Sequence, residues 1–119
     1  MNRNGHILVV ETDDLIRGLL ARWLGEAGHT VHARPVGDPA LEGEVRLVIA
    51  DVANPRRAGS LVASLRTYHA PILIVSARFR RGLGPSAAAA RQLGVDGVLP
   101  KPFTRAELLA AVGEVIGDP

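Results

Sequence analysis

Four polar side chains follow apolar stretches of this chain, and their types together suit a divalent cation and a phosphoryl group. Glu11 and Asp51 each end an apolar run, and Ser76 and Lys101 follow two later runs. Carboxylates hold a hard cation through oxygen, whereas a hydroxyl and an ammonium can bind phosphate oxygens. Two acids beside a hydroxyl and an ammonium suit neither hydride transfer nor glycoside hydrolysis. The set therefore predicts a phosphoryl and cation site, provided that the fold brings the four side chains together.

The run that ends in Asp51 indicates how such a site is built. Residues 47–50 are apolar without a polar break, which is typical of a parallel strand buried on both faces. Because burying a carboxylate costs free energy, we expect Asp51 to emerge where the strand meets water. Ligands of open α/β sheets bind at this carboxyl end of the strands.

Strand and helix patterns alternate along the chain. We expect strands over 6–10, 29–34, 46–51, 71–75 and 95–99, and helices over 15–27, 39–43, 57–68, 86–94 and 104–116. The second helix is short. This alternation predicts a single α/β domain over residues 1–119 with a doubly wound five-stranded parallel sheet and helices on both faces. For its strands we expect the order 2-1-3-4-5, which is common among doubly wound sheets. Because neighbouring strands lie roughly 4.8 Å apart, the four strand ends can share one pocket.

Composition removes several classes of function. The absence of cysteine excludes disulfides, thiolate zinc sites and cysteine nucleophiles, and the four histidines show no metal-ligand spacing. A net charge of +2 and 3% aromatic residues argue against direct nucleic-acid binding. The sequence shows neither a membrane-length apolar run nor a signal-peptide pattern, so we expect a cytoplasmic protein without membrane contact.

Lysine is the rarest basic residue of the chain. Of its fourteen basic residues thirteen are arginine, and Lys101 is the one lysine. Chance is the simplest explanation. The sharper interpretation is that this position needs a compact ammonium on a flexible stem, which a guanidinium does not supply.

Five stretches match a known family in order and position. They are residues 7–11, 47–51, Pro55 with Gly59, residues 74–77 and residues 97–103. Together they resemble the receiver domain of bacterial two-component response regulators, and the resemblance covers essentially the whole chain. It implies that Asp51 accepts a phosphoryl group from a histidine kinase or a histidine phosphotransfer protein.

The resemblance also implies roles for the neighbours of Asp51. Ser76 would be the switch hydroxyl that turns towards the phosphoryl group, and Ala77 and Lys101 would bind that group. The peptide bond between Lys101 and Pro102 is expected to be cis.

A Mg²⁺ ion is the cofactor that the resemblance implies. Its ligands would be Glu11, Asp51 and the backbone carbonyl of Ala53, with Thr12 or Asp13 as the weakest member of the set. The family usually has two consecutive acids at positions 11 and 12. Because Thr12 is a neutral ligand and Asp13 lies one residue further on, we expect weaker Mg²⁺ binding than in typical receivers. Glu11 and Asp13 could instead serve only the dipole of the first helix.

The sequence is best interpreted as a stand-alone receiver rather than an enzyme. Phosphorylation would switch its contacts with a downstream protein, or with a second copy, through the face of strand 4, helix 4, strand 5 and helix 5. Thr12, together with Val98 where the family commonly has an aromatic residue, motivates a degenerate, phosphorylation-independent interaction module as the alternative. A flavin carrier is disfavoured, because the acidic residues 11–14 would repel phosphate.

Overall fold

The computed structural model describes residues 6–33, 45–52, 58–76 and 94–117. In chain order the elements are β1 (His6–Val10), α1 (Asp14–Glu26), β2 (Val31–Ala33), β3 (Val45–Asp51), α2 (Ala58–Leu65), a short 3-10 helix (Arg66–Tyr68), β4 (Ile72–Ser76), β5 (Gly97–Pro100) and α4 (Arg105–Ile116). The helices expected over 39–43 and 86–94 fall outside these ranges, except for Gly94, which lies in a turn.

The five strands form one parallel sheet in the order β2-β1-β3-β4-β5, as the sequence predicts. The register places Val10 beside Ala50, Asp51 beside Val75, and Ser76 beside Pro100. The carboxyl ends of β1, β3, β4 and β5 therefore lie at the same edge of the sheet, which is the edge that the polar residues require.

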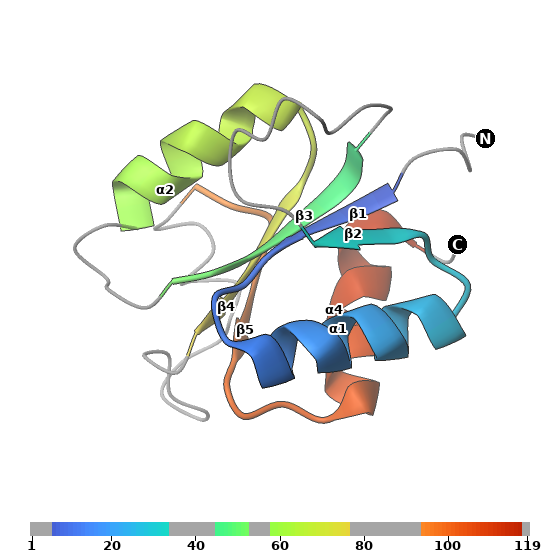
Figure 1. Ribbon diagram of the computed structural model, residues 1–119. Helices are drawn as coiled ribbons and strands as arrows, with labels where there is room; N and C mark the ends of the chain where they lie inside the picture. Colours follow the sequence, from blue (N-terminus) through green and yellow to red (C-terminus); the bar gives the residue numbers. More distant parts are fainter. Residues whose placement is uncertain (1–5, 34–44, 53–57, 77–93, 118–119) are drawn as a thin grey trace.

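Successive strand residues point to opposite faces of the sheet, and each face has its own core. Figure 1 shows α1 and α4 covering one face and α2 the other. Under α1 and α4 the buried strand residues are Ile7, Val9, Leu47, Ile49, Leu73, Val75 and Leu99. Under α2 they are Leu8, Val48, Ala50, Ile72, Ile74 and Val98. Both faces are apolar, which explains why the central strands show no alternation in the sequence.

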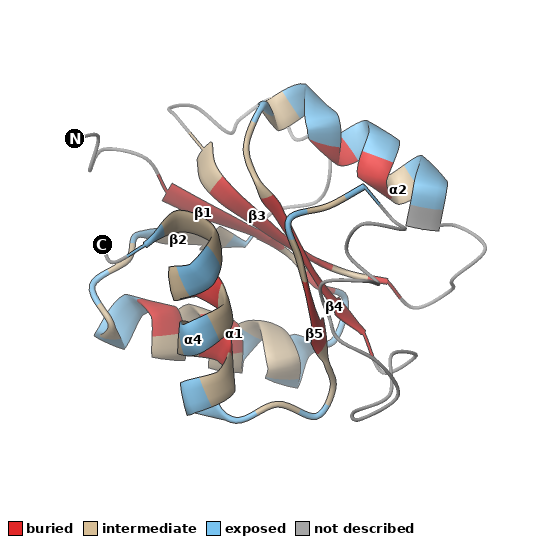
Figure 2. Ribbon diagram, turned by 180° about the vertical axis from the view of Figure 1, so that it is seen from behind, coloured by how far each residue is buried: buried red, intermediate tan, exposed pale blue. Residues whose placement is uncertain are grey.

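Burial is greatest in the middle of the sheet and ends at the site edge. All five residues of β4 are buried, whereas β3 changes from buried at Ala50 to half-buried at Asp51 (Figure 2). Burying a large aliphatic side chain contributes about 1.5–3 kcal/mol. The apolar run therefore holds β3 inside, and its carboxylate emerges at the end, as expected.

The helix caps follow the sequence closely. Thr104 and Glu107 form a capping box at the start of α4, with both reciprocal hydrogen bonds present. Gly28 follows the end of α1 with a positive φ of 103°, as expected of a helix stop. Trp23 packs edge to face against Phe103, with ring centroids 6.3 Å apart, so its role is packing.

Several boundaries differ from the predicted ones by a few residues, and three of the differences have a clear cause. Ser76 is the last residue of β4 rather than the residue after it, because its backbone carbonyl still accepts a hydrogen bond from the Lys101 amide. The fifth strand begins at Gly97, because the Asp96 carboxylate accepts the Ile72 amide at 2.9 Å. The expected helix over 57–68 tightens into a 3-10 turn after Leu65.

Candidate functional site

An ammonium joins two carboxylates at the carboxyl edge of the sheet. Lys101, just after β5, places its Nζ 2.5 Å from Oε1 of Glu11 and 2.9 Å from Oδ1 of Asp51. Glu11 follows β1 and Asp51 ends β3, so the three residues come from three different strands. They are separated by up to 90 positions in the sequence, and the sheet topology alone brings them together.

Backbone hydrogen bonds hold the members of this cluster in place. The second carboxylate oxygen of Glu11, Oε2, accepts the amide of Thr12 at 3.1 Å. The backbone carbonyl of Glu11 accepts a hydrogen bond from the Arg17 guanidinium at 3.1 Å. The amide of Lys101 donates to the carbonyl of Ser76 at 2.9 Å, and the following peptide bond to Pro102 is cis.

Exposure separates the two carboxylates. The side chain of Glu11 is 1% exposed, whereas those of Asp51 and Lys101 are 12% and 15% exposed. Asp51 is therefore the carboxylate that a reagent can reach. Burial raises the pKa of Glu11, and the neighbouring charge of Asp51 adds to this, while the hydrogen bond from Lys101 opposes it. Burial by itself lowers the pKa of Lys101, but its hydrogen bonds to both acids outweigh burial and raise it.

Ser76 lies beside the cluster with its side chain directed at the backbone of the neighbouring strand. It is fully buried, and its hydroxyl donates to the carbonyl of Val52 at 2.7 Å. Val52 follows Asp51 directly, so the hydroxyl is linked to the segment that carries the carboxylate. Ala53 and Ala77, which the sequence also implicates, lie outside the described residues.

Thr12 and Asp13 do not join the cluster through their side chains. Thr12 is exposed. The Asp13 carboxylate caps α1 by accepting the amide of Ile16 at 3.0 Å, so the helix-cap alternative describes it better. In the part of the chain that the structure describes, no group of three or more histidine, cysteine and acidic side chains is arranged to hold a metal ion.

The two clustered carboxylates nonetheless fit a Mg²⁺ ion. Mg²⁺ is commonly bound through one or two carboxylates, with waters and phosphate oxygens completing its coordination. Glu11 and Asp51 converge on one point, since both reach the same ammonium. They are the described residues that would hold the ion.

Arg17 is a site residue that the sequence analysis missed. Its guanidinium pairs with Asp14 one turn earlier and also donates to the backbone of Glu11. The spacing of three residues between Asp14 and Arg17 on a predicted helix is the signal that could have shown the ion pair. The contact to Glu11 depends on how the helix leaves β1, which no local pattern specifies.

Comparisons with known proteins point to one family. Residues 7–113 match the family described as the response regulator receiver domain. Protein PetR of Rhodobacter capsulatus is 37% identical over 93% of this chain and 48% of its own length. Sensor kinase CckA of Brucella abortus is also 37% identical, over 92% of this chain and 12% of its own length. The chain thus spans about half the length of PetR and about an eighth of the length of CckA.

A solved structure supports the fold. The receiver domain of a sensor histidine kinase from Pseudomonas aeruginosa, described with a magnesium ion coordinated in its active-site cleft, superimposes with a TM-score of 0.72. The match covers 97% of this chain and 99% of the other at 23% identity.

In the described residues of this chain, no helix is long and apolar enough to cross a membrane.

Proposed function

The chain belongs to the response regulator receiver domain family, and on this basis we propose that it is a phosphorylatable switch whose phosphoacceptor is Asp51. Receiver domains are signalling modules that interact with histidine kinases or phosphotransfer proteins. The observation that carries the proposal is the contact of Lys101 with both acids, since it holds the partly exposed carboxylate of Asp51 beside a fixed positive charge. We propose a location in the cytoplasm, where such phosphodonors present their histidines.

The proposed reaction moves a phosphoryl group from a histidine of the partner to this carboxylate. An oxygen of Asp51 forms a bond to phosphorus as the bond between phosphorus and the imidazole nitrogen breaks. The nitrogen keeps the electron pair, and the imidazole takes up one proton from solvent. Lys101 is placed to pair with the phosphoryl oxygens, because charge-assisted hydrogen bonds to phosphate are among the strongest in proteins.

A Mg²⁺ ion bound by Glu11 and Asp51 would neutralise the charge of the phosphoryl oxygens. Among the residues that the structure describes, Glu11 and Asp51 supply carboxylates for this ion, and Thr12 occupies the position where the family usually has a third acid. We therefore propose that Mg²⁺ binds weakly. Thr12→Asp restores the third carboxylate and is expected to lower the Mg²⁺ concentration needed for half-maximal phosphorylation about tenfold, the change that one extra charge-assisted ligand of about 1.4 kcal/mol gives.

Ser76 is the proposed switch. Its hydroxyl would leave the carbonyl of Val52 and donate to the phosphoryl group on Asp51. This exchange would bias the face formed by β4, β5 and the last helix, through which we propose that a downstream protein, or a second copy of the chain, is bound.

Intact-mass analysis with a small phosphodonor such as acetyl phosphate tests the proposal. We expect a single phosphoryl adduct that needs Mg²⁺ and is absent in Asp51→Asn. The matched control is Glu26→Gln, an exposed acid at the far end of α1 that should keep the adduct. An adduct of equal yield in Asp51→Asn would refute the assignment of the phosphoacceptor.

A second function is favoured by specific residues. Thr12 leaves the acid cluster one carboxylate short, and Val98 is a buried core residue where the family commonly has a mobile ring. These two features suit an interaction module that works without phosphorylation. Partner binding that is unchanged in Asp51→Asn, together with no adduct at any Mg²⁺ concentration, would favour this module over the phosphorylatable switch.

A further inference from the structure

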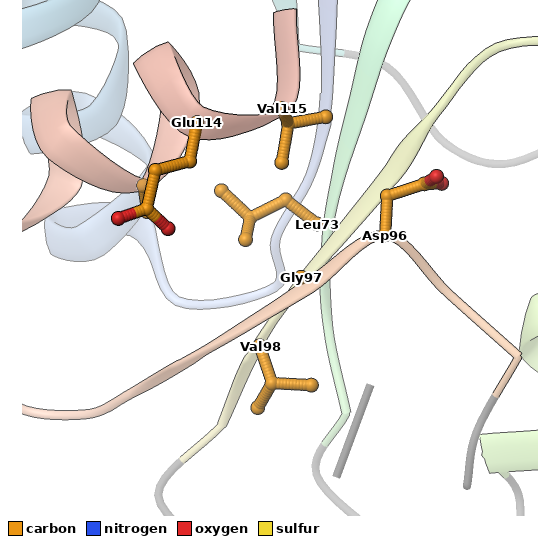
Figure 3. A pocket seen from close by; sticks show the side chains of 7 residues that line it. Leu73, Asp96, Gly97, Val98, Glu114 and Val115 are labelled. Atoms are coloured by element: carbon orange, nitrogen blue, oxygen red, sulfur yellow. The ribbon is translucent and has the colours of Figure 1, made fainter. Parts of the chain in front are cut away.

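A small hollow lies between β5 and α4, near the end of β5 that is remote from Lys101. Its floor is apolar, formed by Leu73, Ala111 and Val115 beside the backbone of Gly97, and its volume is about 110 Å³. Figure 3 shows Leu73 and Val115 in the middle, with the carboxylates of Asp96 and Glu114 on opposite sides. Pockets for cofactors and drug-sized ligands measure about 300–1,000 Å³, so this hollow suits a single side chain.

Glycine keeps the hollow open. A Cβ on Gly97 would lie 3.0 Å from Cδ1 of Leu73 and 3.4 Å from Cγ2 of Val115, so any side chain there would crowd the floor. β5 is the last strand of the sheet, and its edge has no strand neighbour among the described residues. The hollow is thus part of the edge face of the sheet.

The charge around the hollow is negative on both sides. One oxygen of Asp96 accepts the Ile72 amide at 2.9 Å, which fixes this carboxylate at the rim. Glu114 is exposed, and its side chain makes no hydrogen bond or ion pair with any residue that the structure describes. The described residues that line the hollow include no basic side chain. An apolar floor between two acids complements a long aliphatic stem that ends in a cation.

We propose that this hollow binds an arginine or lysine side chain of a separate, basic partner protein. The stem would lie over Leu73 and Val115, and the cationic end would reach Glu114, with the Asp96 carboxylate adding negative charge on the other side of the hollow. A two-fold pairing of two copies, hollow against hollow, would bring like charges together, so a different partner is favoured. The inference rests on the proposed function, because it assigns a chemistry to the partner bound at the β4, β5 and α4 face.

Backbone amide shifts measured by NMR test the hollow by itself. The probe is N-acetyl-arginine methylamide, and the matched neutral probe is N-acetyl-citrulline methylamide. We expect saturable shifts at Gly97 and Glu114 with the arginine compound only. Because an exposed ion pair contributes modestly, Glu114→Gln should weaken the apparent affinity about two- to fivefold. Glu26→Gln, an exposed acid on α1, should leave it unchanged.

Two further measurements keep the inference falsifiable. Gly97→Ala narrows the floor and should also reduce the shifts, with folding checked from its amide spectrum. Equal shifts with citrulline, shifts confined to other acidic surfaces, or none at all would overturn the proposal. Shifts at these amides on raising the protein concentration alone would make a second copy the occupant and overturn the choice of a separate partner.

Phosphorylation is measured separately on the same proteins. Glu114→Gln and Gly97→Ala should still accept a phosphoryl group on Asp51. A wild-type protein that binds the arginine probe but takes no phosphoryl group would refute the switch and leave the hollow standing. The reverse result would refute the hollow and leave the switch standing.

Discussion

Replacing Lys101 by methionine removes the charge that separates two acids. Its Nζ lies within 3 Å of an oxygen of Glu11 and an oxygen of Asp51, so these oxygens lie less than about 6 Å apart by geometry. Without the ammonium, two negative charges at that separation repel each other by about 3 kcal/mol at an effective dielectric constant of about 20. Partial exposure of Asp51 reduces this, and we expect Lys101→Met to lower the free energy of unfolding by about 1–2 kcal/mol at pH 8.

The loss should shrink as the pH falls. Burial already raises the pKa of Glu11 above its usual value, and removing Lys101 raises it further. In the variant, the folded state then binds more protons than the unfolded state between the unfolded and folded pKa values of Glu11. The variant therefore gains stability as the pH is lowered towards 5, and the difference between its free energy of unfolding and that of the wild type becomes smaller.

Urea denaturation followed by the fluorescence of Trp23, which packs against Phe103, measures the effect. Arg105→Met removes an exposed cation from the same region and should change stability by less than about 0.5 kcal/mol at either pH. Adding Glu11→Gln to Lys101→Met should recover most of the loss at pH 8. A Lys101→Met protein as stable as the wild type at pH 8, or a gap of equal size at pH 8 and pH 5, would show that the reasoning is wrong.

Three further predictions concern stability elsewhere in the fold. Burial lowers the pKa of His6 from its usual 6.5, so the unfolded state binds more protons near that pH, and the free energy of unfolding falls as the pH drops from 7.5 towards 5.5. His6→Leu should make the free energy of unfolding, measured by urea titration, depend less on pH, and an unchanged dependence would contradict this. Thr104→Ala removes the α4 cap and should cost about 1 kcal/mol by thermal denaturation, whereas no loss would mean that the cap is energetically silent. Gly94 has a φ of +74°, and a Cβ there would lie 2.7 Å from Nη2 of Arg66, so Gly94→Ala should lower the free energy of unfolding by about 1–2 kcal/mol. Gly113 lies in open space, so Gly113→Ala should stabilise α4 by about 0.5–1 kcal/mol. Equal effects of the two changes would refute the strain at Gly94.

Local patterns were sufficient for the architecture. Unbroken apolar runs predicted the buried strands, and the alternation of strands with helices predicted a doubly wound sheet, whose strands have the expected common order β2-β1-β3-β4-β5. The carboxylate that ends the third run predicted the position of Asp51, since a charge leaves the core where the apolar run stops. The Thr104 capping box was also readable, because its hydrogen bonds join residues only three apart.

Contacts between distant residues were decided by the tertiary structure. The edge contact between the rings of His6 and His32, with centroids 4.5 Å apart, depends on how β1 pairs with β2. The sequence neighbourhood of neither histidine contains the other, so this contact could not be predicted from local patterns.

The sequence by itself determined which residues reach the carboxyl edge of the sheet, because strand length and hydrophobicity are local properties. Only the tertiary structure decided what they do there: that Lys101 bridges Glu11 and Asp51, that Ser76 donates to Val52, and that Gly97 leaves a hollow beside Val115. Strand register and helix packing set those distances, and both arise from the packing of the whole core rather than from any one segment.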